Sequence, residues 1–473
     1  MKAIAALAAA VLLPTPFAAH AAEPLRPDQV AFRDLYRELV ETNTVLGSGS
    51  CTLAASRMAF RLKAAGIPDS AITPFAIPDH PEEGGLVVVY PGRSGKRKSV
   101  LLLAHIDVVE AKREDWTRDP FKLVEDGGHF YARGAFDDKA QAAIWVDTLV
   151  RFARARYRPD RGVKLALTCG EETTWAFNGA EWLAANRRDL IDAAFALNEG
   201  GGGRTDGKSL VDGGKLMVQT LQVGEKAVQN YRLEVTNPGG HSSIPVRDNA
   251  IYRLADALMR LRGLDFPVEL NATTRAFLRQ AGAVRGGEEG AAMAALAADP
   301  ADARAASVLD RDRIFHAMLR TTCVATLVDG GHANNALPQR AGANVNCRLL
   351  PGHSAEEVRD RLSAAIGDPD VKVTLVPPVW PAGAFPPLDE RILEPATKLA
   401  AKYFPGVPLI PAMTVGSTDA IFLNAVGIPT YGVPGLWANP DGNGTHGLNE
   451  RIEARALFQG RDYLFDLVKL LAD

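Results

Sequence analysis

The residues best suited to chemistry in this chain are histidines and carboxylates that follow apolar, strand-forming runs. LLLAHIDVVE at residues 101–110 carries His105 and Asp107, and ARGAFDDKAQ at residues 132–141 carries Asp137 in a turn with a glycine nearby. Further along, the same arrangement presents Glu171, Glu172, Glu199 and His446. Imidazole and carboxylate groups are ligands for zinc and similar divalent ions. The sequence therefore indicates a metal-dependent hydrolase.

This set of side chains is large enough for two metal ions. A site with two ions ~3.5–4 Å apart needs one bridging carboxylate and, for each ion, a histidine and a further carboxylate. The sequence offers such a set: His105 and Glu199 for one ion, Glu172 and His446 for the other, and Asp137 between them. Spacing alone does not assign these roles, because adjacent acidic residues such as Asp137 and Asp138 more often belong to turns or helix caps.

Two acidic residues next to these ligands have a different expected task. Asp107 is well placed to orient the imidazole of His105, because ligating histidines usually donate their second N–H to a carboxylate. Glu171 need not bind metal. It remains available as the general base that takes a proton from water activated by the metals.

Predicted strands alternate with predicted helices around these residues. Apolar runs at 86–90, 100–104, 163–168 and 193–197 predict buried strands, and helical patterns cover 27–66, 140–156 and 176–185. This alternation predicts βαβ units, a largely buried sheet and ligand sites at the carboxyl ends of strands. His105, Glu171, Glu172 and Glu199 all follow such strand ends. Position and chemistry therefore agree.

The pattern changes near residue 225 and returns near residue 385. Strands are predicted at 228–235, 323–328 and 343–349, a helix at 250–261, and a further helical stretch at 271–320. We expect an α+β unit at residues 225–384, termed the lid, inserted into a domain of residues 24–224 and 385–473. The predicted fold class is α/β, with a mixed, largely parallel sheet flanked by helices and an inserted α+β lid.

The composition is that of an ordinary globular protein of two domains. Its 473 residues are 47% hydrophobic and 23% charged, and the net charge of −3 gives no electrostatic footprint for nucleic acid or an anionic membrane. Residues 1–21 predict a cleaved signal peptide, with Lys2, an apolar run at 3–13 and an Ala19-His20-Ala21 cleavage pattern. We expect an exported protein, periplasmic or secreted, with no membrane partner after cleavage.

Four cysteines are present: Cys51, Cys169, Cys323 and Cys347. None belongs to a C-x-x-C pair, so a thiolate zinc site is not expected. Cys323 and Cys347 lie almost symmetrically about a turn-rich stretch at 329–338. In an oxidising compartment they could form a disulfide, or they could remain two isolated buried thiols, and the sequence leaves both possibilities open.

The motifs also occur together, in one order, over essentially the whole mature chain. They are His105-Ile-Asp-Val-Val109, Trp116, Tyr131-Ala-Arg-Gly-Ala135-Phe-Asp-Asp-Lys139, Glu171-Glu172, Glu199-Gly-Gly201, Pro238-Gly-Gly-His241, Gly416-Ser-Thr-Asp419 and His446. In this order they resemble the dizinc aminoacylase and carboxypeptidase family, which includes succinyl-diaminopimelate desuccinylase and carnosinases. The helical stretch at 271–320 and Leu197-Asn-Glu-Gly200 are most similar to the Gly-X carboxypeptidase and N-acyl amino acid hydrolase branch.

The resemblance implies a cofactor and a set of roles. It implies two Zn²⁺ ions, with Co²⁺ or Mn²⁺ as alternatives, bound by His105, Asp137, Glu172, Glu199 and His446, with Glu171 as the base. It implies a homodimer formed through the lid, in which His241 reaches the partner's active site and steadies the developing oxyanion. It also implies substrate contacts from Asn335, Arg348, Ser417 and Thr418. Arg348 is the expected partner of a substrate carboxylate.

The implied reaction is hydrolysis of an amide bond next to a free carboxylate, of the dipeptidase or carboxypeptidase type, by a water between the metals. The substrate would be a small peptide or an N-acyl amino acid. An N-acyl amino acid amidohydrolase remains an alternative, since lid residues decide the substrate. An inactive binding protein on the same scaffold is the other alternative. Such a protein should have lost a ligand or the base, and all six positions are filled here.

Overall fold

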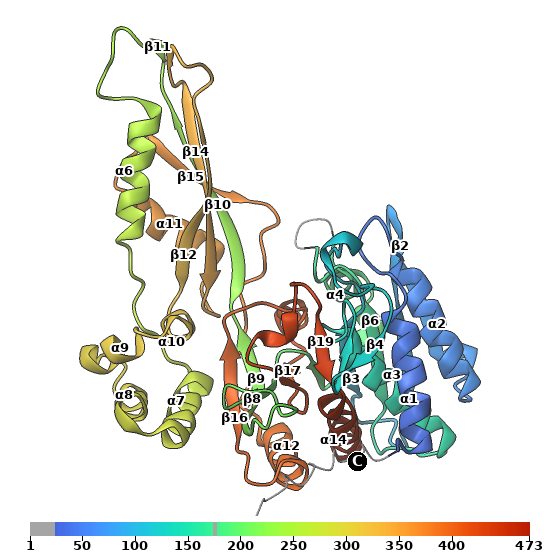
Figure 1. Cartoon of the computed structure of the whole chain (residues 1–473). Coiled ribbons are helices and arrows are strands. Elements are labelled where there is room, and N and C mark those ends of the chain that lie inside the picture. The colour runs from blue at the N-terminus through green and yellow to red at the C-terminus, as the bar shows by residue number, and fades with distance from the viewer. Residues whose placement is uncertain (1–23, 174–176) are drawn as a thin grey trace, which may run out of the picture.

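The computed structural model describes residues 24–173 and 177–473. Two separate β-sheets organise this part of the chain (Figure 1). The predicted signal segment at 1–21 lies outside the described residues. Within them, no helix has the length and apolar character needed to cross a membrane.

The larger sheet has ten strands and holds most of the predicted site residues. In spatial order the strands are β1 (Ile72–Ile77), β2 (His80–Tyr90), β6 (Val163–Thr168), β3 (Val100–His105), β7 (Phe195–Asn198), β17 (Thr430–Gly432), β9 (Leu216–Glu225), β8 (Gly202–Thr205) and β18 (Trp437–Ala438), with β16 (Leu409–Thr414) beside β9. β6, β3, β7 and β17 run parallel to one another. The sheet is thus mixed with a parallel centre, as the sequence predicted.

Helices cover both faces of this sheet, which is why β3 is buried along its whole length. Leu102 and Ala104 pack on the side of α1 (Pro27–Val40), α2 (Cys51–Ala64), α3 (Lys139–Arg154), α12 (Glu390–Tyr403) and α14 (Ala454–Ala472). Leu101 and Leu103 point the other way, toward α4 (Gly179–Asn186), α5 (Arg188–Ile191) and α13 (Ala420–Ala425). Alternate residues of a strand point to opposite faces, so an unbroken apolar run serves two helical layers.

A third, smaller sheet has three short strands. It consists of β19 (Arg451–Glu453), β5 (His129–Tyr131) and β4 (Val124–Asp126). Short 3₁₀ turns lie at Asp69–Ala71, Arg113–Asp115 and Gly442–Gly444.

The second large sheet forms the lid. Its order is β12 (Thr322–Gly330), β14 (Arg340–Leu349), β10 (Ala227–Thr236) and β15 (Val371–Val376), all antiparallel. Apolar residues of α6 (Ala250–Arg262) and α11 (Ala355–Ile366) pack against β10 and β14. A short ladder of β11 (Gly240–His241) and β13 (Ala336–Leu337) lies at the tip, at the far end from the ten-stranded sheet (Figure 1).

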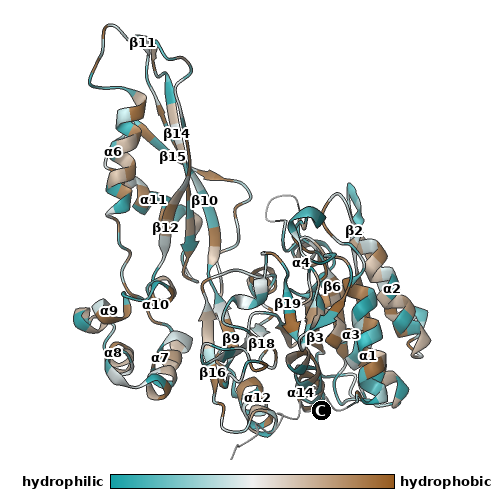
Figure 2. Ribbon diagram, in the orientation of Figure 1, coloured by the Kyte–Doolittle hydropathy of each residue, from teal (hydrophilic) through white to brown (hydrophobic). Residues whose placement is uncertain are grey.

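The helical stretch predicted at 271–320 divides into four helices with an apolar core of their own. They are α7 (Ala272–Arg285), α8 (Gly287–Ala298), α9 (Ala303–Leu309) and α10 (Arg313–Met318). In Figure 2 both hydrophobic and hydrophilic residues occur in this bundle, and buried residues such as Leu278 of α7 and Met293 of α8 belong to its core. Met318, Leu350 and Met413 then join this bundle to β16 and to the base of the lid.

All four cysteines are paired. Cys323 and Cys347 are directly opposite residues of β12 and β14 and form a disulfide, so the alternative of two isolated thiols is wrong. Cys51 and Cys169 form a second disulfide, which the sequence did not predict. The two sulfurs are 118 residues apart in sequence, and only the packing of α2 against the sheet brings them together.

Candidate active site

Three neighbouring strands deliver the predicted ligands to one edge of the sheet. His105 is the last residue of β3, Glu171 and Glu172 follow β6, and Glu199 follows β7. The three strands are parallel and adjacent, in the order β6, β3, β7. Their carboxyl ends therefore meet, as the general rule for ligand sites in α/β sheets requires.

Asp137 comes from a turn that a buried carboxylate holds in place. Glu450 accepts hydrogen bonds from the backbone N–H groups of Gly134, Phe136 and Asp137, at 3.0, 2.9 and 3.0 Å. Its carboxylate also pairs with the Arg133 guanidinium at 2.8 Å. Glu450 was not among the predicted site residues, because its contacts are to backbone groups more than 300 residues away.

The decisive geometry is that the two oxygens of Asp137 face different histidines. Oδ1 lies 3.1 Å from Nε2 of His105, and Oδ2 lies 3.3 Å from Nε2 of His446. Glu199 Oε1 lies 3.7 Å from the same nitrogen of His105, and Glu172 lies 2.9 Å from that of His446. The five side chains thus form two groups, each with one histidine, that share Asp137.

This donor set fits two divalent cations. Burial and neighbouring carboxylates raise the pKa of Glu199 well above its usual range. Hydrogen bonds to Asp137 and Glu172 raise the pKa of His446 to about 10. Without metal, these raised pKa values mean that Glu199 and His446 tend to hold protons at the place where the nitrogen and oxygen atoms converge. A metal ion would replace these protons, because metal ligands bind in the deprotonated form. Two divalent cations would supply the positive charge that these acidic groups attract.

Asp107 contacts both halves of the set. Its backbone oxygen lies 3.2 Å from Nδ1 of His105, and its Oδ1 lies 3.6 Å from the same nitrogen. Its other carboxylate oxygen accepts the backbone N–H of Glu172 at 3.0 Å. With a hydrogen on Nδ1, the lone pair of Nε2 faces Asp137 and Glu199, as a ligand requires.

Glu171 lies beside the candidate ligands but belongs to neither of the two groups that share Asp137. One of its oxygens lies within 4.8 Å of ligand atoms of His105 and Glu172. Burial, together with nearby carboxylates such as Asp419, raises its pKa well above the usual range. A carboxylate of raised pKa next to the predicted metal ligands is suited to proton transfer near neutral pH.

Two tethers fix the loop that carries Glu171 and Glu172. The disulfide of Cys169 to Cys51 holds its start. Asp419 accepts hydrogen bonds from Thr168 Oγ1 at 2.9 Å and from Asn178 Nδ2 at 2.6 Å. Sequence analysis did not assign a role to Asp419, although it belongs to the Gly416-Ser-Thr-Asp419 motif.

Of the four residues assigned to substrate, the structure places three near the base of the lid or in the β16 loop. Arg348 lies on β14, where burial lowers the pKa of its guanidinium. Ser417 Oγ is buried and has no hydrogen-bond partner among the described residues. Thr418 Oγ1 instead donates to Glu225 at 2.7 Å and accepts from Asn198 at 3.1 Å. Substrate contacts by these side chains remain predictions.

His241 and Asn335 are not near the predicted metal ligands of their own chain. Both lie exposed at the tip of the lid, where His241 pairs with Ala336 (Figure 1). The backbone N–H of Ser243 donates to Nδ1 of His241 at 3.1 Å. This contact places the ring hydrogen on Nε2, which points to a donor role for that nitrogen.

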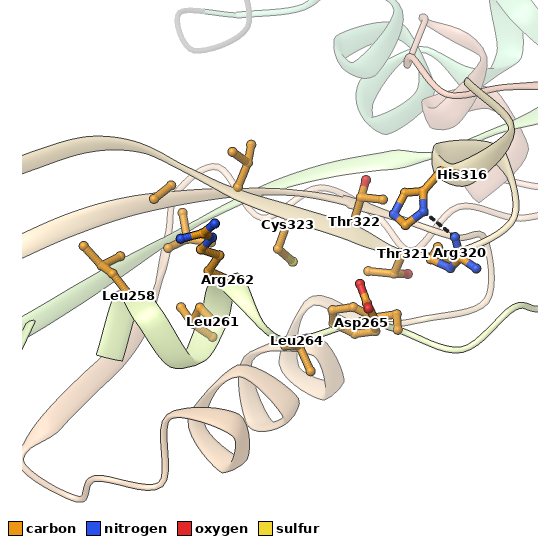
Figure 3. Close-up of a pocket in the computed structure, with 14 residues that line it drawn as sticks. Leu258, Leu261, Arg262, Leu264, Asp265, His316, Arg320, Thr321, Thr322 and Cys323 are labelled. Carbon is orange, nitrogen blue, oxygen red and sulfur yellow. Dashed lines mark hydrogen bonds between the residues drawn. The ribbon is translucent and has the colours of Figure 1, made fainter. Parts of the chain in front are cut away.

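A different cavity at the base of the lid, of about 390 Å³, contains none of these residues (Figure 3). It lies between α6, α10 and β12. Among its charged lining groups, Arg320 contacts His316 at 2.5 Å and Asp310 at 2.5 Å, and no predicted ligand or base belongs to the lining. It is therefore not the catalytic cavity.

Comparisons with known proteins agree with this geometry. The sequence model of peptidase family M20/M25/M40 matches residues 101–470. The chain belongs to this family. It is a metal-dependent hydrolase of amide bonds, with the fold class that the sequence predicted.

The proteins similar to this chain differ in their named activities. The N-fatty-acyl-amino acid synthase/hydrolase PM20D1 of Homo sapiens is 27% identical over 82% of this chain and 77% of its own length. A probable carboxypeptidase S-like 2 of Dictyostelium discoideum is 26% identical over 81% and 74%. The crystal structure of the metallo-carboxypeptidase Sso-CP2 from Sulfolobus solfataricus aligns with a TM-score of 0.68 and 16% identity, over 95% of this chain and 100% of that one.

Proposed function

We propose that the enzyme hydrolyses an amide bond next to a free carboxylate, in a dipeptide, at the C-terminus of a short peptide, or in an N-acyl amino acid. The single observation that carries the proposal is Asp137, whose two oxygens face His105 and His446 separately. Arg348 supports the carboxylate preference, because its guanidinium is partly buried and burial lowers its pKa.

The roles of the chain's own groups follow from their contacts. His105, Asp137, Glu172, Glu199 and His446 would hold two divalent cations, zinc or alternatively cobalt or manganese. When bound, such ions polarise the substrate carbonyl and lower the pKa of water. Glu171 takes a proton from the attacking water and passes it to the nitrogen of the leaving amine. Asp107 keeps the ring of His105 turned toward the ligand side.

The oxyanion would be stabilised from a second subunit. We propose that residues 225–384 act as an inserted lid domain and that two copies associate through it. β12 is an edge strand of the lid sheet, and its Val324, Leu327 and Val328 are 60%, 69% and 70% exposed. An apolar, unpaired edge strand favours pairing with another chain. The partner's His241 would then donate from Nε2 to the oxyanion.

We also propose that the protein is exported from the cytoplasm. Residues 1–21 have the pattern of a secretory signal. Both disulfides are typical of an oxidising compartment such as the periplasm. After cleavage we expect neither a membrane nor a nucleic-acid partner.

The choice between peptide and N-acyl substrates is open to one assay. Metal-free protein is reloaded with zinc, cobalt or manganese and given dipeptides and N-acyl amino acids, each as the free acid and as the C-terminal amide. We expect hydrolysis of the free acids and a loss of at least about 100-fold in kcat/KM for the amides, because leaving the partly buried guanidinium without a carboxylate partner is costly. Equal rates for acids and amides would refute the carboxylate requirement. A metal-replete protein that hydrolyses no substrate would favour the inactive binding protein instead.

A further inference from the structure

A single buried carboxylate joins the two ends of the loop that carries Glu171. Oδ2 of Asp419 accepts the hydroxyl of Thr168 at 2.9 Å, and its Oδ1 accepts the side-chain N–H of Asn178 at 2.6 Å. Thr168 is the last residue of β6, and Asn178 directly precedes α4. All three residues are buried. Asp419 therefore bonds both to the residue where the loop leaves the sheet and to the residue where it enters the next helix.

This carboxylate has no role in its own helix. Asp419 occupies the N-cap position of α13, where an aspartate usually accepts N–H groups of the first helical turn. Within the described chain its side chain makes no such bond, and Oγ1 of Thr418 accepts the N–H of Ala420 at 3.1 Å instead. Both oxygens of Asp419 are thus left for the loop of Glu171.

The far end of the loop is held by this contact and one other. Oδ1 of Asn178 accepts two backbone N–H groups at the start of α4, at 2.8 and 3.0 Å, so its Nδ2 faces Asp419. The backbone N–H of Gly179 donates to the carbonyl oxygen of Cys169 at 2.7 Å. The two ends therefore lie side by side, and the span from which Glu171 extends is fixed.

We propose that Asp419 is a positioning residue for Glu171, which it keeps where the proton of the attacking water is taken up. The inference rests on the proposed function, since that function makes Glu171 the base. The disulfide of Cys169 and the bond from the Glu172 N–H to Asp107 hold only the first part of the loop. Proton transfer is sensitive to such support, because a shift of ~1 Å can cost about 100-fold in rate.

Asparagine at position 419 can keep both contacts, and alanine cannot. Asp419→Asn presents its oxygen to Asn178 and its NH₂ to Thr168, whose hydroxyl can then donate to the carbonyl oxygen of Ala104, 3.3 Å away. With saturating zinc, we expect Asp419→Ala to lower kcat about 10–100-fold while KM changes less than about threefold. Bound zinc should stay at the wild-type level, and Asp419→Asn should restore most of kcat.

The Glu171→Gln background separates positioning from a loss of structure. If Asp419 acts through Glu171, Asp419→Ala should lower kcat by less than about threefold once the base is absent. Asn424→Ala is the matched control, because Asn424 is also buried on α13 and its Oδ1 accepts the backbone N–H of Thr430 at 2.9 Å. This control should lose thermal stability and keep the wild-type kcat.

A milder variant keeps the test decisive if Asp419→Ala does not fold. Thr168→Val removes one hydroxyl and leaves the contact of Asp419 with Asn178 in place. It should lower kcat about 3–10-fold in the wild-type background and have no further effect on Glu171→Gln. Hydrogen exchange at the N–H of Gly179 should also become faster in this variant, but not in Asn424→Ala.

The outcomes separate this inference from the function on which it rests. Hydrolysis by the wild type upholds the proposed function. An equal loss of kcat with and without Glu171, or a loss as large in Asp419→Asn as in Asp419→Ala, would overturn the positioning role and leave that function intact. Zinc lost from Asp419→Ala would likewise overturn it, because the effect would then fall on the ligand Glu172. If the wild type hydrolyses no substrate, both proposals fail together.

Discussion

At the scale of single residues, Glu171 and Glu172 are sequence neighbours with different surroundings. Glu172 contacts His446 at 2.9 Å, whereas Glu171 lies partly buried beside the candidate ligands and its pKa is raised. Glu171→Gln keeps the shape of the side chain and removes proton transfer. We expect kcat to fall about 10²–10⁴-fold. Bound metal, measured by elemental analysis, should remain unchanged.

The control for this variant is Glu394→Gln, at an exposed position of α12. It should retain wild-type kcat and metal content. Undiminished turnover in Glu171→Gln with full metal content would refute the assignment of the base. Loss of metal in that variant would instead make Glu171 a ligand.

Sequence reasoning named the candidate ligands that the structure brings together, but not the residues that hold them in place. His105 and Glu199 were predictable because strand-forming runs end at them. Glu450 was not, since it acts by accepting backbone N–H groups of Gly134, Phe136 and Asp137, and no spacing in the sequence reports such contacts. The division of Asp137 between two histidines likewise depends on a loop more than 300 residues away.

At the scale of elements, the disulfide of Cys51 and Cys169 joins α2 to the loop of Glu171. Their sulfurs and a carboxylate oxygen of Asp107 all lie within 4.8 Å of one another. We expect Cys51→Ala/Cys169→Ala to lower the free energy of unfolding by about 2–5 kcal/mol. It should also weaken metal binding, because Asp107 and the Glu172 loop lose a common support.

Cys323→Ala/Cys347→Ala is the matched control, since that disulfide joins two strands of the lid. It should lower thermal stability and leave metal affinity, measured by competition with a chelator, unchanged. Equal effects of the two double variants on metal affinity would show that the first disulfide has no special relation to the site.

A second element-scale prediction concerns Glu225, the last residue of β9, just before the lid begins. Burial raises the pKa of its carboxyl from 4.5 to about 8. The folded protein therefore binds this proton more tightly than the unfolded chain. The resulting stabilisation is complete below about pH 4.5 and is lost as the pH rises through about 8.

The Gln side chain of Glu225→Gln stays neutral at every pH. The part of the pH dependence of the unfolding free energy that comes from Glu225 should therefore be absent in the variant. Between pH 5.5 and pH 9 the variant should gain about 3 kcal/mol of stability relative to wild type. Chemical denaturation at the two pH values measures this difference, with Glu394→Gln as the exposed control. A constant difference across the range would contradict a raised pKa.

Strand and helix positions were predictable from periodicity, and the pairing of Cys323 with Cys347 was foreseen as one of two options. The Cys51 to Cys169 bond was not, because its partners lie 118 residues apart on elements that only the folded core brings together. Local hydrophobic periodicity indicates where helices and strands lie. A disulfide between residues far apart in sequence leaves no such periodicity, so the sequence alone does not predict it.

At the scale of the whole molecule, the tip of the lid lies far from the ligands of its own chain (Figure 1). If a partner subunit supplies His241, two defective variants should complement each other. Coexpressed His241→Ala and Glu171→Gln chains form mixed dimers in which one site has both residues intact. With random pairing, about a quarter of wild-type activity should return, because half of the dimers hold one intact site of two.

Activity no higher than the sum of the separate variants, in a preparation shown to contain mixed dimers, would contradict a shared site. Sequence analysis proposed that residues 225–384 are an insertion, but it gave no indication of how far the tip at β11 and β13 lies from the predicted metal ligands. That distance depends on the continuous antiparallel register of β10 and β14, which is a property of the folded sheet.

Metal stoichiometry tests the central claim most directly. Metal-free protein is titrated with Zn²⁺, and bound ions per chain are counted by native mass spectrometry. We predict two ions per chain for wild type, one for His446→Ala, which retains His105, Asp137 and Glu199, and none for Asp137→Ala at equal free zinc. A single ion in the wild type, or two in His446→Ala, would contradict a site in which Asp137 joins two metal positions.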